Sequence, residues 1–217
     1  MKLFFSVLLA LPVVGLAQQP QFTITGNVQG LTDGSTVSVT DVSNPGDTVA
    51  SSTVKNGQFV LTGHVSEPNL FEVNFDAAKK KIPLFMGNDK MQMSGSTDNL
   101  AQMKTTGSPS NDDFADFQAV FTPYFTRLNV MAKQINPSLG HSDPVYASFQ
   151  KLSDTIFVVI DEWIKKKPNS YVSPFVLVVV NQLTDDVVAQ DKRLHSLSAA
   201  VQQGYYAQYL QKMLDDA

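Results

Sequence analysis

The sequence predicts an α+β protein in which an antiparallel β-sandwich-like domain precedes an all-helical domain. Between Phe22 and Gly107, short runs alternate apolar and polar residues, and turn residues recur at intervals of about 8–12 residues, as in sandwiches and barrels. Beyond Gly107 the apolar residues recur at steps of three and four, the period of a helix. We therefore expect a leader over 1–17, a β domain over 18–108 and a helical domain over 109–217.

The first 17 residues have the pattern of a secretory signal peptide. Lys2 precedes an apolar run from Leu3 to Leu16, and Gly15 and Ala17 occupy the small-residue positions of a cleavage site. The run is shorter than the roughly 20 residues of a membrane-spanning helix. We expect an exported protein that has no transmembrane segment after cleavage.

The composition excludes several kinds of chemistry. The 217 residues carry a formal net charge of −4 and include no cysteine. An acidic chain has no surplus of positive charge for nucleic acid, which we exclude as a partner. Without cysteine the chain has no disulfide, no thiol nucleophile and no thiolate zinc site, so its stability must come from a buried core.

The predicted strands of the β domain are short and alternate in polarity. They cover 22–28, 36–41, 48–54, a run after Gly57, 70–76, 82–86 and 91–95. Pro83 cannot donate a hydrogen bond to a neighbouring strand, which predicts an edge strand or a bulge at 82–86.

The stretch 55-KNGQFVLTGHV-65 contains the strongest local signal. Asn56-Gly57 favours a type I′ hairpin turn, because both residues tolerate a positive φ. After the turn, Phe59 and Leu61 point to one face, and we expect Phe59 to pack in the core. Gly63 is expected to permit a bulge or a close backbone approach.

The helical domain is expected to begin with Ser110 as the cap of a long helix, which Pro123 kinks or splits. A second helix is expected to follow the loop 136–144 and to end at 165-KKKP-168. Their apolar faces are Phe114, Phe117, Phe121, Phe125, Leu128, Met131 and Ile135, and Val145, Phe149, Leu152, Ile156, Ile160 and Trp163.

The segment 173–183 suits either a buried strand or a buried helix, and Ser173 as cap with Pro174 after it favours the helix. Asp185 or Asp186 is expected to begin the next helix, which continues through Val201. Gly204 is then expected to end that helix, and a last helix is expected over 205–217.

The search for chemistry predicts no catalytic, cofactor-binding or metal-binding residue, and hence no enzyme. His64, His141 and His195 are expected in a strand, a loop and a helix, without the spacing of a metal motif. The paired aspartates are interpreted as charges at helix starts and in the tail. The methionines Met86, Met91, Met93 and Met103 are interpreted as core residues rather than soft-metal ligands.

The order of four segments resembles domain of unknown function 4369, found at the N-terminus of exported proteins of Gram-negative bacteria. These segments are 22-FTITGNVQGLTDGSTVSV-39, 56-NGQFVLTGHVSEPNLFEV-73, 81-KIPLFMGNDKMQMSGS-96 and 106-TGSPSNDDF-114. The matching positions are Phe22, Gly26, Asp33, Gly34, Gly57, Phe59, Gly63, Pro68, Gly107, Ser108 and Asn111.

The resemblance implies a periplasmic or envelope protein in which a helical region and a thioredoxin-like domain with a Cys-x-x-Cys motif follow this domain. The present chain holds no such motif, so the resemblance implies a non-catalytic module for substrate docking, positioning or dimerisation. The segment 205–217 has no helix stop signal and ends in acidic residues, which fits truncation before a further domain; a short natural variant is the alternative. The implied partners are a C-terminal thioredoxin-like domain, an envelope protein substrate or a second copy in a homodimer.

Two other classes stay open. A free-standing periplasmic binding protein for a small molecule, glycan or peptide would expose several of the aromatics Phe71, Tyr124, Trp163 and Tyr171 in one concave pocket. A cysteine-free hydrolase would bring carboxylates together with His64 or His195. A flat apolar patch near the C-terminus would favour the module instead.

Overall fold

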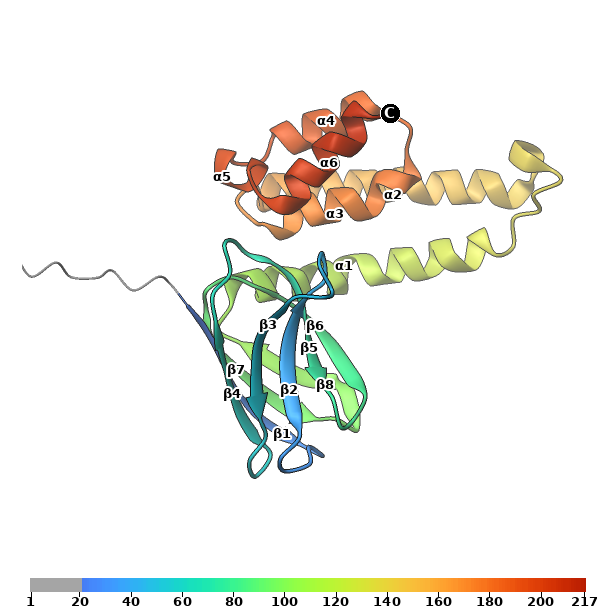
Figure 1. Cartoon of the computed structure of the whole chain (residues 1–217). Coiled ribbons are helices and arrows are strands. Elements are labelled where there is room, and N and C mark those ends of the chain that lie inside the picture. The colour runs from blue at the N-terminus through green and yellow to red at the C-terminus, as the bar shows by residue number, and fades with distance from the viewer. Residues whose placement is uncertain (1–20) are drawn as a thin grey trace, which may run out of the picture.

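The computed structural model describes residues 21–217 (Figure 1), and the predicted signal peptide lies outside the described residues. Eight strands over 22–106 form two packed four-stranded sheets, and helices follow. The predicted α+β class and the order of its two parts are confirmed. The strands are β1 (Phe22–Gln29), β2 (Thr36–Asp41), β3 (Thr48–Thr53), β4 (Gln58–Gly63), β5 (Asn69–Phe75), β6 (Lys80–Met86), β7 (Lys90–Ser96) and β8 (Asn99–Thr106).

The two sheets have the orders β4-β1-β7-β8 and β3-β2-β5-β6. Every neighbouring pair is antiparallel except β1 and β7, which run parallel. Alternate residues of both sheets point inward and form a core that excludes water. Its fully buried members include Phe22, Ile24, Val28, Val37, Val39, Leu61 and Val73.

The Asn56-Gly57 turn has the predicted backbone but joins two different sheets. Asn56 has φ 52° and Gly57 has φ 70°, as a type I′ turn requires. The strand before the turn pairs with β2 and the strand after it pairs with β1, so only Lys55 and Gln58 bridge directly. The turn therefore closes one side of the sandwich instead of forming a regular hairpin.

The opposite side of the sandwich lies between two edge strands. One is β6, where Pro83 occupies an edge position as predicted. The other is β8, which the sequence did not reveal. Its residues are mostly exposed, so its sequence lacks the clear apolar alternation of an inner strand.

Helix α1 (Pro109–Ala132) begins two residues earlier than predicted. The cap is Ser108 rather than Ser110: its hydroxyl oxygen accepts a hydrogen bond from the Asn111 N–H at 3.3 Å and donates to Asp89 at 2.7 Å. Pro109 then takes the first helical position. Its missing N–H costs nothing there, because an N–H at that position has no partner within the helix.

Of the two effects predicted for Pro123, a kink or a split, the split does not occur, because α1 runs through Pro123 as one helix. The proline side chain is exposed, and the apolar face on both sides of it is buried. Burial of Phe121 before the proline and Leu128 after it holds both halves in one helix.

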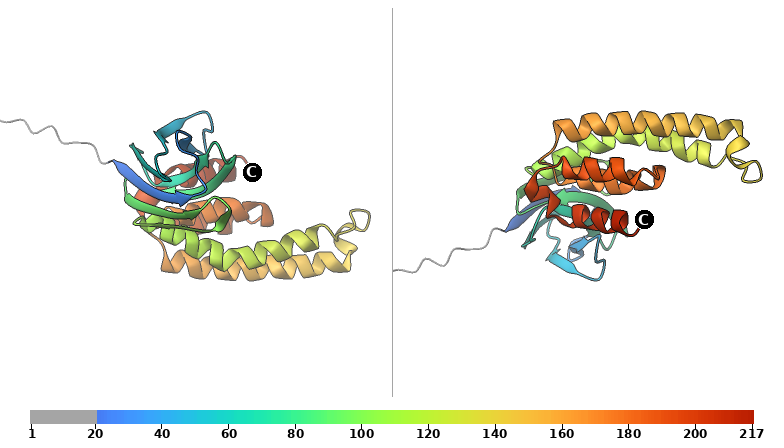
Figure 2. Two further views of the ribbon diagram at one scale, coloured as in Figure 1. Left: turned by 90° about the horizontal axis from the view of Figure 1, so that it is seen from below. Right: turned by 90° about the horizontal axis from the view of Figure 1, so that it is seen from above.

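Helix α2 (Pro144–Lys166) turns back along α1 after a loop with a short 3₁₀ turn, η1 (Gly140–Ser142). Asp143 caps it by accepting the Val145 N–H at 2.7 Å. At the other end, Lys167 donates hydrogen bonds of 2.6 Å to Asp113 and of 2.6 Å to Asp116 at the start of α1. In Figures 1 and 2 the hairpin of α1 and α2 extends as an arm beyond the remaining helices.

The third segment is helical, as the sequence favoured, but its predicted cap is not Ser173. Helix α3 (Val172–Val180) already includes this residue, whose side chain is fully buried. The Ser173 hydroxyl accepts from the Trp163 indole N–H at 3.2 Å and donates to the Lys167 carbonyl at 2.7 Å. It thus links α2 to α3. A 3₁₀ turn, η2 (Asn181–Leu183), follows α3.

The predicted helix through Val201 is two helices, α4 (Val187–His195) and α5 (Ala199–Gln202), followed by α6 (Tyr205–Asp215). Asp186 caps α4, as one of the two candidates. The break falls at Ser196–Ser198 because the Ser196 hydroxyl bonds the Arg193 carbonyl at 2.7 Å. The Ser198 N–H bonds the Pro168 carbonyl at 2.9 Å, outside any helix.

The sandwich and the helices share a core where they meet. Phe85 of β6 is fully buried among helical residues, with its ring 5.9 Å from Phe114, 6.1 Å from Phe175 and 6.3 Å from Tyr206. This aromatic contact fixes α1, α3 and α6 against the end of the sandwich. Among the described residues, no helix combines the length and the apolar character that crossing a bilayer requires.

Candidate functional site

Two exposed tyrosines form an apolar stripe on α6. Tyr205 and Tyr209 are 41% and 46% exposed, and their rings stack with centroids 6.1 Å apart and an interplanar angle of 12°. Residues four apart lie on one helical face, and partly buried Met213 continues the stripe one turn later. We call Tyr205, Tyr209 and Met213 the tyrosine stripe.

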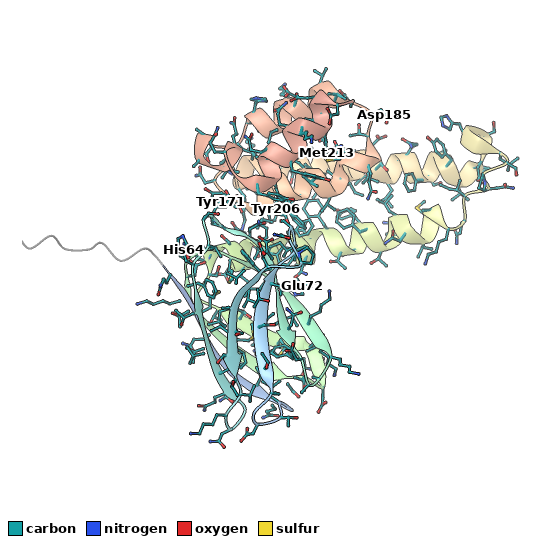
Figure 3. The ribbon with its side chains drawn as sticks, in the orientation of Figure 1. His64, Glu72, Tyr171, Asp185, Tyr206 and Met213 are labelled. Atoms are coloured by element: carbon teal, nitrogen blue, oxygen red, sulfur yellow. The ribbon has the colours of Figure 1, made fainter. Side chains whose placement is uncertain are left out.

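The remaining faces of α6 explain why the stripe is oriented outward. Leu210 is fully buried, and Ala207 and Leu214 on the same face lie in the helical core. Tyr206 points toward the junction with the sandwich, where its ring lies 5.0 Å from Phe175 (Figure 3). Burial raises the pKa of Tyr206 to about 12, because the charged phenolate is poorly solvated at this junction. The stripe is thus the apolar side of α6 that the fold leaves open.

The sandwich anchors the start of α6. The carboxylate of Glu67, in the loop after β4, accepts the Tyr205 N–H at 2.7 Å. A carboxylate at a helix N-terminus satisfies an unpaired N–H and interacts favourably with the helix dipole. A Cβ at Gly204 would lie 2.9 Å from the Glu67 carboxylate and 3.0 Å from the Tyr171 ring, so a larger residue there would displace these side chains. The position of the stripe relative to the sandwich is therefore fixed.

A second apolar feature lies at the base of the arm. It is an open groove of about 380 Å³ between α1, α2 and the end of α3. We call it the arm groove; its lining residues are Phe125, Leu128, Asn129, Ala132, Phe149, Val179, Gln182 and Leu183.

Most of the site residues predicted from the sequence lie inside the sandwich or at its turns. Phe59 is 3% exposed and lies over Gly26, and a Cβ at Gly63 would lie 2.7 Å from the Phe22 ring. Gly57 supplies the turn between the sheets. The structure therefore packs Gly26 against Phe59, and Gly63 against Phe22 at the other end of the same strand pair.

The other three predicted positions are separate from that cluster. Gly34 has φ +80° in an open turn, and Pro68 lies next to Gly87, whose added Cβ would be 3.1 Å from the proline ring. Gly107 has φ +93°, and a Cβ there would collide with the Lys90 carbonyl. Gly107 sits between β8 and the Ser108 cap, where the chain passes from sheet to helix.

The histidines occupy three unrelated places. His64 follows the end of β4 instead of lying within a strand, and His141 stacks on Tyr146 at 4.5 Å in the arm's loop. His195 pairs with Asp191 one helical turn earlier at 3.3 Å. Among the described residues, no group of three or more histidine, cysteine, aspartate or glutamate side chains could hold a metal ion.

The four aromatics considered for a binding pocket do not gather. Phe71 is 3% exposed inside the sandwich and Trp163 is 6% exposed in the helical core. Tyr124 and Tyr171 are half-buried against the helical core. The arrangement lacks the shared concave pocket that a binding protein built on these residues would need.

Charge at the junction of α1 and α2 is arranged for stability. Burial disfavours the charged form of Lys167 and by itself would lower its pKa. The hydrogen bonds and negative charges of Asp113 and Asp116 have a larger effect, so the pKa of Lys167 is raised. The lysine Nζ also lies 5.3 Å from the centroid of the Trp163 ring. This group holds the start of α1 and the end of α2 together.

Sequence reasoning did not single out the tyrosine stripe. The signal was present in 205-YYAQYLQKMLDDA-217, where tyrosine, tyrosine and methionine recur at steps of four beside a separate buried face. Separating the two faces requires knowing which side of α6 packs on α3, and the contacts of α6 with α3 and α4 supply that information.

The comparisons with known proteins bear on the sandwich. Residues 22–114 match the family described as Domain of unknown function (DUF4369), which confirms the resemblance seen in the sequence. The matched segment covers all eight strands and the first residues of α1. No curated protein and no solved structure matches the chain.

Proposed function

We propose that this chain is the non-catalytic N-terminal accessory module of an exported thioredoxin-like thiol–disulfide oxidoreductase. The module holds the redox domain of the same polypeptide against α6 and so positions it for its substrate. The observation that carries the proposal is the tyrosine stripe, a rigid apolar surface on the last helix. The family match over residues 22–114 supports the resemblance to this domain, and that resemblance implies a redox domain that follows.

The stripe suits docking for three physical reasons. Tyrosine offers a large, rigid and amphipathic surface with little side-chain entropy to lose, which is why it is enriched at interfaces. The Glu67 contact at 2.7 Å and the junction packing of Tyr206 hold α6 in place before a partner arrives. A stripe of this size suits a modest contact between domains of one polypeptide.

A photo-crosslinking experiment tests the proposal. A photoreactive phenylalanine analogue replaces Tyr209 in the protein as its host makes it, and crosslinked peptides are identified by mass spectrometry. We expect crosslinks to a Cys-x-x-Cys segment of the same polypeptide. The matched control is the same analogue at Val60, which is 54% exposed on the sandwich. Crosslinks that are equal at both positions, or that involve no thioredoxin-like segment, would contradict the proposal.

A stability control separates docking from folding. Changing both exposed tyrosines to serine removes one surface pair, which is worth about 0.2–0.5 kcal/mol in a helix. We expect the thermal midpoint to change little while the crosslinked contact is lost. A large fall in the midpoint would show that the stripe stabilises the fold instead.

The alternative function is that of a free-standing periplasmic binding protein, and the arm groove is the observation that favours it. Its volume of about 380 Å³ and its apolar lining suit part of a small apolar ligand or a peptide side chain. Native mass spectrometry of the protein from its host tests this reading. A bound molecule that is lost when Asn129→Trp fills the groove would support it, and a ligand-free spectrum would contradict it.

A further inference from the structure

A groove lies between α2 and α4 and shares no residue with the tyrosine stripe. Its volume is about 640 Å³. The lining residues of α4 and its C-terminal cap are spaced three, one and three residues apart, so one face of that helix forms a wall of the groove. We call it the α2–α4 groove; its lining residues are Asp161, Ile164, Lys165, Pro168, Ala189, Lys192, Arg193 and Ser196.

The charge of this groove opposes that of the whole chain. Three cationic side chains and one anionic side chain line it, whereas the sequence carries a net charge of −4. The one carboxylate is already paired: Asp161 accepts from Arg193 Nε at 2.7 Å and from its Nη2 at 3.3 Å. Arg193 also covers the Phe157 ring at 4.8 Å, so it is held as part of the wall.

The two lysines are the groups available to a ligand. Lys165 and Lys192 are exposed, and neither lies within 4.0 Å of a carboxylate oxygen of any other described residue. Lysines near the last turn of a helix also interact favourably with the helix dipole, which would account for their presence without a ligand. The two lysines alone therefore do not indicate a binding surface.

Exposed valines lie on the same faces of α2 and α4 as these two lysines. Val188 and Val158 are 80% and 62% exposed, the highest values among the large hydrophobic side chains of the described residues. Val188 lies one helical turn before Lys192, and Val158 lies one turn before Asp161 and two turns before Lys165. Helix-dipole effects explain the lysines but do not explain two apolar side chains exposed to water on the same helix faces.

We propose that the α2–α4 groove binds an acidic amphipathic helix of a partner protein. Carboxylates of that helix pair with Lys165 and Lys192, and its apolar side chains cover Val158 and Val188. A groove between two helices suits a third helix, whose apolar face is read at helical spacing. This binding surface is independent of the tyrosine stripe, because the groove and the stripe share no residue.

A binding titration tests this inference with a defined probe. The probe is a fluorescein-labelled synthetic peptide of about 18 residues with glutamate on one helical face and leucine on the other, long enough to form a helix on binding. Fluorescence anisotropy follows its binding to the intact chain. A peptide of the same composition with a scrambled order and a lysine–leucine peptide are the reference ligands.

The variants isolate the two parts of the surface. We expect Lys165→Glu with Lys192→Glu to weaken binding about tenfold or more, because the rim charges then repel the probe. Lys133→Glu with Lys151→Glu changes the net charge equally on the arm and should weaken it less than about twofold. Val188→Ser should weaken binding about threefold to tenfold through lost apolar contact.

Three results would overturn the inference. The scrambled peptide could bind as tightly as the amphipathic one, which would mean that helical order is not recognised. The arm variant could lose as much affinity as the groove variant, which would mean that only net charge matters. The chain could bind vesicles containing phosphatidylglycerol and not the peptide, which would make the surface a lipid site.

Discussion

Phe59 on β4 lies directly over Gly26 on β1, its partner in the strand register. The ring occupies the space that a side chain on Gly26 would fill. It also meets Phe75 of the opposite sheet edge-on, with centroids 6.3 Å apart. A glycine in one strand thus makes room for the aromatic residue that joins the two sheets.

Replacing Phe59 with alanine should destabilise the protein strongly. The side chain is 3% exposed, and removal of a buried phenylalanine lowers the free energy of unfolding by about 3–5 kcal/mol. Urea unfolding followed by circular dichroism measures the change. Val60→Ala on the exposed face of the same strand is the control, with an expected effect within about 0.5 kcal/mol. An unchanged midpoint for Phe59→Ala would refute the packing described for this strand.

The pairing of Gly26 with Phe59 predicts non-additive effects. Gly26→Val forces a side chain into the ring and should destabilise the protein by about 1–3 kcal/mol or more. In a Phe59→Ala background the space is empty, so the same change should be far better tolerated. A double-mutant cycle measures the coupling, which we expect to exceed about 1 kcal/mol. Additive effects would mean that the two positions do not compete for one space.

Loss of the Glu67 carboxylate should loosen the start of α6. Glu67→Ala leaves the Tyr205 N–H without its 2.7 Å partner, and loss of a helix cap lowers stability by about 0.5–2 kcal/mol. Hydrogen exchange should accelerate most at the first turn of α6. Glu162→Ala, on the exposed side of α2, serves as the reference variant. Unchanged exchange in α6 would show that the carboxylate does not anchor this helix.

The raised pKa of Tyr206 predicts a loss of stability at high pH. The folded protein holds the phenolic proton more tightly than the unfolded chain, whose tyrosine titrates near 10, so stability falls as the pH rises from about 10 to about 12. Tyr206→Phe removes this proton and should show a shallower decline over that window. Unfolding midpoints for both proteins between pH 9 and pH 12 provide the measurement. Parallel curves would contradict the burial of this phenol.

The sandwich could be predicted from the sequence because its signals are local. Alternation and turn residues identified every strand except β8, and Asn56-Gly57 identified its turn. These local signals did not predict which strands pair. The turn joins strands of different sheets, and the pairing of β4 with β1 is a long-range contact. Edge strand β8 escaped notice because an exposed strand needs no apolar alternation.

The helix boundaries were predicted less accurately, for a different reason. Ser110 and Ser173 both suit a cap, but tertiary contacts placed Ser108 and Tyr171 at the helix starts instead. Pro123 weakens a helix by a known amount, yet the buried face on both sides outweighs it. The tyrosine stripe is likewise defined by which face of α6 is left uncovered, and sequence spacing alone does not determine that.

The most direct test of the accessory-module proposal is to sequence the coding DNA beyond the codon for Ala217. The proposal predicts an open reading frame that continues into a thioredoxin-like segment with a Cys-x-x-Cys motif. A stop codon directly after Ala217 would contradict it, and the binding-protein function centred on the arm groove would then be favoured.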